Sequence, residues 1–130
     1  MTDVHYLLLS AALTWIMIMS AAELRTPTWT RAGAKLAFGN REQLPEASPL
    51  AARADRAAKN MIENLVVFVA VFVAARAEGT DATLGSAIFF FARLAYFVTY
   101  LAGIVYVRSL FWAVALVGIL WIALGVLGVV

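Results

Sequence analysis

The chain has 130 residues, of which 64% are hydrophobic and only 14% are charged, with a formal net charge of +2 at pH 7. Soluble domains average about one quarter charged residues, so this composition excludes an ordinary soluble domain and indicates a membrane protein of one domain, residues 1–130. The chain contains no cysteine, which excludes disulfides, cysteine-ligated metals and a cysteine nucleophile, and we expect no metal site.

The first apolar segment runs from about Tyr6 to Ala22. No basic residue precedes it, since Asp3 is the first charge, and it is longer than the apolar region of a typical signal peptide. We therefore expect a retained transmembrane helix, with a cleaved signal peptide as the alternative.

Three further apolar segments follow, at about Arg53–Arg76, Ala82–Val107 and Leu110–Val130. Each approaches or exceeds the roughly 20 residues with which a helix crosses a hydrocarbon core of about 30 Å. The short alternating segments of a membrane β-barrel are absent from the sequence. The predicted fold is therefore all-α, an integral membrane four-helix bundle.

The long connection at 23–53 is rich in cations and holds all three prolines. Its turn signals around Gly39 and Pro45 predict a structured connection without a helix. Short basic loops remain cytoplasmic, so we expect this connection to face the cytoplasm of a bacterial inner membrane, with both termini periplasmic. The alternative is a charge distribution that carries no topological information. The cations of this connection are Arg25, Arg31, Lys35, Arg41 and Arg53.

Polar side chains gather on one face of each of the two middle segments. Successive residues of an α-helix are rotated by about 100°, which places the polar residues of the second segment within a sector of about that width. These residues are Arg53, Arg56, Asn60, Glu63 and Asn64. In the third segment, Arg93, Tyr96 and Tyr100 share one stripe, and the helix is expected to end at Tyr106 and Arg108.

A charge inside a membrane segment costs about 2.5–3.5 kcal/mol on insertion scales, so Glu63 and Arg93 need partners. One interpretation is a structural Glu63–Arg93 ion pair between the two helices. The other is a polar pocket in which an excess of guanidinium groups over carboxylates binds an anionic ligand. Glutathione, with two carboxylates, one ammonium and a thiol, fits that charge pattern, but residue spacing alone leaves another peptide or a lipid headgroup open.

A bound glutathione thiol would need help to ionise, because the reference pKa of a cysteine thiol is about 8.5. A nearby cation increases the thiolate fraction at neutral pH, and Arg108 or a tyrosine hydroxyl is a candidate for that role. The sparse charges of mixed sign form no stripe suited to nucleic acid.

The segments RADRAAKNMIENLVVF and RLAYFVTYLAGIVYVRSLFW resemble the membrane-associated proteins in eicosanoid and glutathione metabolism, the MAPEG family. The loop sequence AFGNREQLPE resembles the bacterial branch of that family. The resemblance spans nearly the whole chain and implies a homotrimer with glutathione sites between subunits near the cytoplasmic face. It also implies a lipophilic acceptor that enters from the bilayer lipids.

The resemblance also implies roles for individual residues. Arg108, assisted by Tyr100, would activate the thiol, while the glutathione-binding residues would be Arg53, Arg56, Asn60, Glu63, Arg93 and Tyr96. Two departures are visible: the interval from Tyr100 to Arg108 differs by one residue from the eukaryotic synthases, and Tyr96 replaces the histidine of the prostaglandin-synthase branch. Ser109 matches a serine of that branch, with helix-terminal packing as the alternative to a thiolate contact.

The expected function is that of a glutathione transferase or peroxidase of the membrane. It would transfer glutathione to lipophilic electrophiles, reduce lipid hydroperoxides, or do both. The alternative is a non-catalytic lipid-binding or partner-presenting protein of the same fold. A transporter is disfavoured, because the chain shows neither discontinuous helices nor internal repeats.

Overall fold

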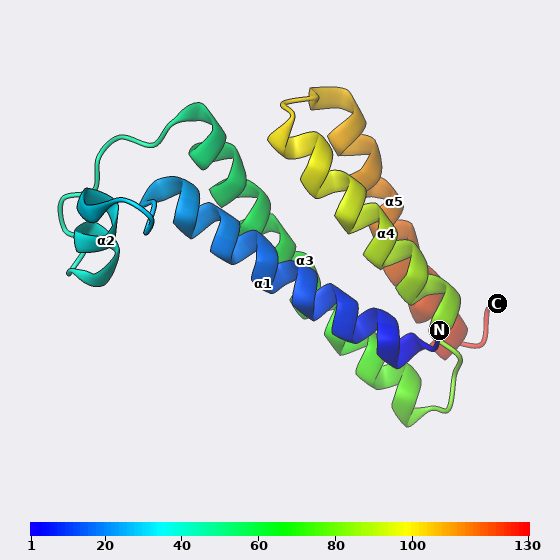
Figure 1. Ribbon diagram of the computed structural model, residues 1–130. Coiled ribbons are helices and arrows are strands. Elements are labelled where there is room, and N and C mark those ends of the chain that lie inside the picture. Colours follow the sequence, from blue (N-terminus) through cyan, green and yellow to red (C-terminus); the bar gives the residue numbers. More distant parts are fainter.

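The structure, a computed structural model, describes residues 1–130 and contains helices and no strands. In chain order the helices are α1 Asp3–Arg25, α2 Arg31–Phe38, α3 Pro49–Ala77, α4 Thr83–Leu101 and α5 Val105–Val126 (Figure 1). All of them except α2 are long and apolar enough to cross a membrane. The prediction of an all-α protein with four membrane-spanning helices is confirmed.

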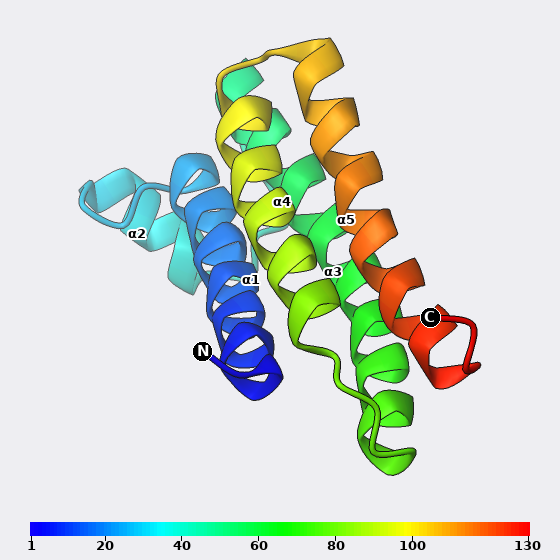
Figure 2. The ribbon, with the colours of Figure 1, turned by 90° about the vertical axis from the view of Figure 1, so that its right-hand side faces the viewer.

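The four long helices form two antiparallel pairs, α1 with α3 and α4 with α5, and α1 and α3 also pack against the second pair. Both chain termini lie at one end of the bundle, together with the loop that joins α3 to α4 (Figures 1 and 2). The beginning of α3 and the α4–α5 turn lie at the other end. This relative placement follows from four consecutive antiparallel spans.

One ion pair ties together the end of the bundle where the termini lie, and a local hydrogen bond orders the loop before α4. Asp3, which is buried, accepts from Arg76 at 3.4 Å and so joins the start of α1 to the end of α3. In the α3–α4 loop, hydrogen bonds from the Thr83 side chain and backbone N–H hold the pKa of the exposed Asp81 carboxyl below its usual value. Asp81 therefore keeps its charge at the start of α4, where the helix dipole favours an anion.

The third span ends earlier than predicted. The predicted segment continued to Val107, but α4 ends at Leu101, and Gly103, with φ of 78°, makes the turn into α5. A positive φ is readily adopted by glycine and disfavoured for other residues. Tyr106 and Arg108 therefore lie in the first turn of α5, so the prediction that they end the third helix is wrong.

The prediction of a helix-free first connection is also wrong, because α2 occupies Arg31–Phe38. The Thr30 hydroxyl accepts from the Gly33 backbone N–H at 3.0 Å, which satisfies one of the free donors at the start of the helix. The end of this connection also differs from the prediction. α3 begins at Pro49 rather than Arg53, because Ser48 caps Ala51 N–H at 3.1 Å and proline is well suited to a first helical turn.

Helices α4 and α5 approach most closely where two glycines face each other. A Cβ atom added at Gly118 would lie 2.6 Å from the Gly85 carbonyl oxygen, and one added at Gly85 would lie 2.6 Å from the Gly118 carbonyl oxygen. Small residues allow membrane helices to gain van der Waals contact that larger side chains would prevent. Gly85 and Gly118 thus allow the close packing of α4 against α5.

Replacing Gly118 by leucine is expected to destabilise the bundle by about 3 kcal/mol, since the new side chain meets backbone that cannot move aside. Thermal unfolding in detergent measures the effect. Val117→Leu is the matched control, because Val117 is 54% exposed on the same helix and should tolerate the added methylene. Equal unfolding temperatures for the two variants would contradict this account of the contact.

Candidate functional site

The polar residues of α3 and α4 meet at the end of the bundle where α3 begins. Arg53 Nε donates to the Leu101 carbonyl oxygen at 3.2 Å, so the guanidinium group holds the last turn of α4. Arg56 Nε donates to the Tyr100 hydroxyl at 3.3 Å. These two bonds connect the start of α3 to the end of α4, so the polar faces of the two helices meet at this end of the bundle.

Arg93 is the most deeply buried charged residue of the site, with 0% of its surface exposed. Its Nη1 donates to Asn60 Oδ1 at 2.8 Å, while its Nε and Nη2 have no hydrogen-bond partner. The guanidinium carbon lies 5.5 Å from the ring centroid of Phe89 and 5.3 Å from that of Tyr96. Aromatic faces attract a cation, yet they leave two strong donors unsatisfied.

Tyr100 contacts both Tyr96 and Arg108. Its ring packs edge-to-face on Tyr96, with centroids 5.3 Å apart, and the Arg108 guanidinium carbon lies 4.5 Å from its centroid. Arg108 approaches from α5, across the Gly103 turn, rather than from the end of α4. The Ser109 hydroxyl donates to the Val105 carbonyl of its own helix at 3.3 Å, which agrees with the packing alternative for that residue.

Glu63 behaves differently from the other predicted site residues. It lies on α3 one turn beyond Asn60, is exposed in the single chain, and forms no ion pair. The interpretation in which Glu63 neutralises Arg93 is therefore wrong, because Asn60 occupies that position instead. Six predicted residues are linked by direct contacts, namely Arg56, Asn60, Arg93, Tyr96, Tyr100 and Arg108. Arg53 bonds to the Leu101 carbonyl oxygen beside them, and Glu63 is an unpaired carboxylate on the same helix as Asn60.

The cluster consequently carries an excess of positive charge. The ion pairs of the molecule are Asp55–Lys59 and Asp3–Arg76, and neither involves a guanidinium group of the cluster. Its four arginines are Arg53, Arg56, Arg93 and Arg108. An arrangement with this surplus is suited to an anionic ligand, and the phenol and guanidinium of Tyr100 and Arg108 can stabilise an anion that forms during a reaction.

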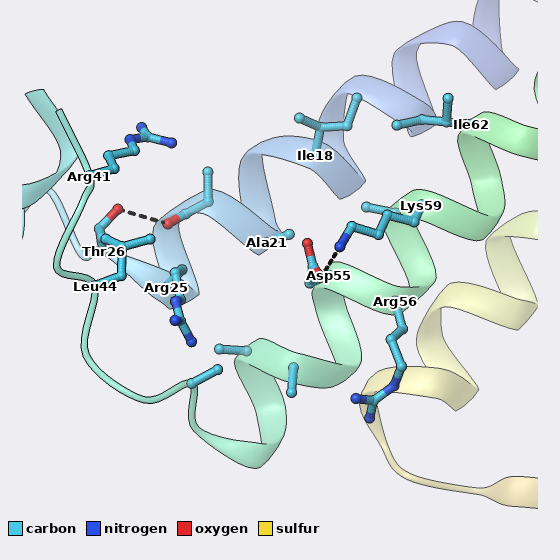
Figure 3. A pocket seen from close by; sticks show the side chains of 15 residues that line it. Ile18, Ala21, Arg25, Thr26, Arg41, Leu44, Asp55, Arg56, Lys59 and Ile62 are labelled. Atoms are coloured by element: carbon cyan, nitrogen blue, oxygen red, sulfur yellow. Dashed lines mark hydrogen bonds and ion pairs between the residues drawn. The ribbon is translucent and has the colours of Figure 1, made fainter.

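A cavity of about 600 Å³ lies on the other side of α3, between α3, the end of α1 and the connection that follows α2 (Figure 3). Most of the residues that line it are apolar, and the lining cations include Arg25, Arg41 and Lys59. Lys59 forms an ion pair with Asp55 at 2.8 Å. Of the predicted site residues only Arg56 borders it, and Figure 3 shows that side chain extending away from Lys59 toward the α4–α5 turn. The sequence interpretation missed this cavity, since only tertiary packing brings α1 and the connection against α3.

The chain was compared with family models, with curated proteins and with solved structures. Neither the comparison with curated proteins nor the comparison with solved structures yields a match. The model of the MAPEG family matches residues 4–128, which include all the helices except the first residue of α1. Together with the four apolar helices, this match makes the chain an integral membrane protein. The chain belongs to the MAPEG family.

Proposed function

We propose that the protein is a glutathione-dependent membrane enzyme that conjugates glutathione to lipophilic electrophiles, reduces lipid hydroperoxides, or does both. The observation that carries this proposal is the unpaired guanidinium cluster, above all the buried Arg93 with two unsatisfied donors. Burying a charge without partners is costly, and a ligand carboxylate at this position would supply the missing acceptors. Membership of the MAPEG family, which includes glutathione transferases and peroxidases, supports the same ligand.

The charges of glutathione complement those of the site. Its two carboxylates require cationic partners, and these are supplied by Arg53, Arg56 and Arg93, with Asn60 holding Arg93 in place. Its ammonium group requires an anion, and Glu63 is a carboxylate with no ion pair of its own. Tyr96 is buried beside Arg93, with the guanidinium carbon 5.3 Å from its ring centroid. Glutathione thus carries carboxylates for the guanidinium groups of the site and an ammonium group for Glu63.

The chemistry requires the thiolate, which Arg108 would stabilise by its charge and Tyr100 by a hydrogen bond from its hydroxyl. In conjugation, the thiolate sulfur forms a bond to an electrophilic carbon, and the leaving group departs with the bonding electron pair. In peroxide reduction, the thiolate attacks the distal oxygen and releases the alcohol, and a second glutathione converts the sulfenic acid to the disulfide and water.

The exposure of Glu63 and Arg56 in the single chain supports a homotrimer. A charged side chain facing hydrocarbon costs about 2.5–3.5 kcal/mol, and a neighbouring subunit over this face of α3 would remove that exposure. A lipophilic acceptor would then reach the thiolate laterally from the bilayer lipids. The basic end of the bundle would face the cytoplasm of a bacterial inner membrane, with the termini on the periplasmic side.

Ligand-induced stabilisation of the purified protein tests this proposal. Glutathione and its S-hexyl derivative are expected to raise the unfolding temperature, since a ligand that binds only the folded state stabilises it. The sulfur-free analogue in which a methyl group replaces the thiol should also stabilise the protein but should support no turnover. An aryl chloride and an organic hydroperoxide, supplied as separate acceptors, distinguish conjugation from reduction.

Two results would contradict the proposal. Absence of stabilisation by all three ligands would remove the basis for a glutathione site. Stabilisation without turnover of either acceptor would favour a non-catalytic protein of the same fold, whose site binds a ligand without reacting with it.

A further inference from the structure

A basic and aromatic surface on α2 is left without a partner in the fold. No other helix packs against α2. Arg31, Lys35 and Phe38 follow i, i+4 and i+7 spacing, so they share one stripe about 60° wide. Phe38 is 86% exposed, and Trp29, just before the helix, is 73% exposed. We call these four residues the α2 surface.

The other side of α2 is held by its own connection. Gly33 is buried and lies against the Pro27 carbonyl group, where a Cβ atom would clash. The Thr28 hydroxyl and backbone N–H donate to the Glu23 carboxylate at 2.9 and 3.1 Å, which folds the connection back onto the end of α1. The orientation of α2 is thereby fixed by local contacts, and its charged stripe remains exposed.

The position of α2 brings this surface to the membrane boundary. Only residues 26–30 separate the end of the membrane-spanning α1 from the start of α2. Such a linker spans at most about 18 Å, and the Thr28–Glu23 bonds shorten it further. α2 projects beside the end of α1 and away from α4 and α5 (Figures 1 and 2).

The charge of the segment matches one kind of surface. Residues 24–41 contain no aspartate or glutamate, and their cations are Arg25, Arg31, Lys35 and Arg41. Arg41 Nε donates to the Ala37 carbonyl oxygen at 3.1 Å, so its positive charge stays at the end of α2. Basic residues next to a membrane span are attracted to anionic lipids, and amphipathic aromatic rings favour the headgroup level.

We propose that the α2 surface binds the anionic headgroups of the adjacent leaflet, with Arg31 and Lys35 at the phosphates and Trp29 and Phe38 inserted between the lipids. The combination of two cations and two exposed aromatic rings favours lipid over a soluble protein partner, because such rings gain little from remaining in water. The surface lies outside the guanidinium cluster, so this inference does not depend on the proposed function.

The absence of cysteine permits a specific test in lipid nanodiscs. Ala32→Cys places a single polarity-sensitive fluorophore on the exposed side of α2, and Glu78→Cys places it in the α3–α4 loop as the control. Discs of phosphatidylcholine are compared with discs that also contain phosphatidylglycerol. The emission at position 32 is expected to shift to shorter wavelength, and quenching by a water-soluble quencher to fall, only in the anionic discs.

A charge-neutralised variant completes the test. Arg31→Gln combined with Lys35→Gln should weaken the lipid-dependent protection by about fivefold for each cation removed, as expected for basic residues at an anionic surface. Identical emission in the two lipid compositions would overturn the proposal. Protection that appears equally in detergent would also overturn it and assign the surface to a protein contact.

Discussion

Replacing Arg108 by alanine is expected to lower kcat for glutathione conjugation by about 100- to 1000-fold, the loss typical when a preorganised group that stabilises a reacting anion is removed. The reason is that Arg108 is the cation that α5 places against Tyr100, 4.5 Å from the ring centroid. Without it, thiolate formation depends on the intrinsic thiol pKa of about 8.5. The rate of the variant should therefore increase steeply as the pH approaches that value, whereas the wild-type rate should change less. Steady-state kinetics with an aryl chloride over a pH series measures both effects.

Two variants control for nonspecific damage to this end of the bundle. Tyr106→Phe alters a side chain that is 89% exposed in the same helical turn and should leave kcat unchanged. Arg108→Lys keeps a cation without the planar guanidinium and should recover part of the rate. If Arg108→Ala has the wild-type kcat and pH profile, Arg108 does not activate the thiol.

Replacing Arg93 by methionine is expected to weaken glutathione binding strongly without lowering the unfolding temperature of the ligand-free protein. Arg93 is fully buried, with only one of its side-chain donors bonded to Asn60 in the single chain. A hydrophobic side chain of similar length avoids the cost of burying that charge, and such replacements are often neutral or stabilising. Loss of a hydrogen bond to a charged ligand group costs about 1.5–3 kcal/mol, which corresponds to a Kd about 10- to 150-fold weaker.

Thermal unfolding with and without glutathione measures both parts of this prediction. Arg93→Lys is the matched variant, because it keeps the charge but loses the forked geometry, and it should bind glutathione with intermediate affinity. A lower unfolding temperature for Arg93→Met, combined with an unchanged Kd for glutathione, would assign Arg93 a structural role and contradict the proposed site.

The fold was largely predictable because the bilayer imposes simple requirements on the sequence. Four long apolar segments must become helices, and the polar residues within them must share a face that is directed away from lipid. Arg93, Tyr96 and Tyr100 illustrate this, since their spacing alone placed them on one stripe and all three side chains are buried. The convergence of that stripe with Arg53 and Arg56 follows from the antiparallel order of the helices.

The details that were not predictable depend on backbone conformation and on helix offset. The apolar sequence continues without interruption through the α4–α5 turn, and the break is made by the positive φ of Gly103, so Arg108 was placed on the wrong helix. Which residue of α3 contacts Arg93 depends on the offset between α3 and α4 along their axes. Asn60 and Glu63 share a face one turn apart, and hydrophobic periodicity does not choose between them.

α2 was missed for a different reason. Its eight residues are too few to show a clear helical period, and prolines and glycines on either side resemble the composition of a loop. The Thr30 cap was the available signal, since a threonine side chain that accepts from the N–H three residues later commonly begins a helix. The cavity between α1 and α3 had no comparable signal, because its walls come from segments far apart in the chain.

Thiolate formation at the guanidinium cluster can be measured directly by ultraviolet difference absorbance as the purified wild-type protein is titrated with glutathione at neutral pH. We expect a saturable absorbance increase that in Arg93→Met requires a much higher glutathione concentration, because this variant binds the tripeptide weakly, and that is lost in Arg108→Ala, because this variant does not stabilise the thiolate. No absorbance increase in the wild-type protein at saturating glutathione, or an increase that both variants retain, would contradict a glutathione-activating site in this cluster.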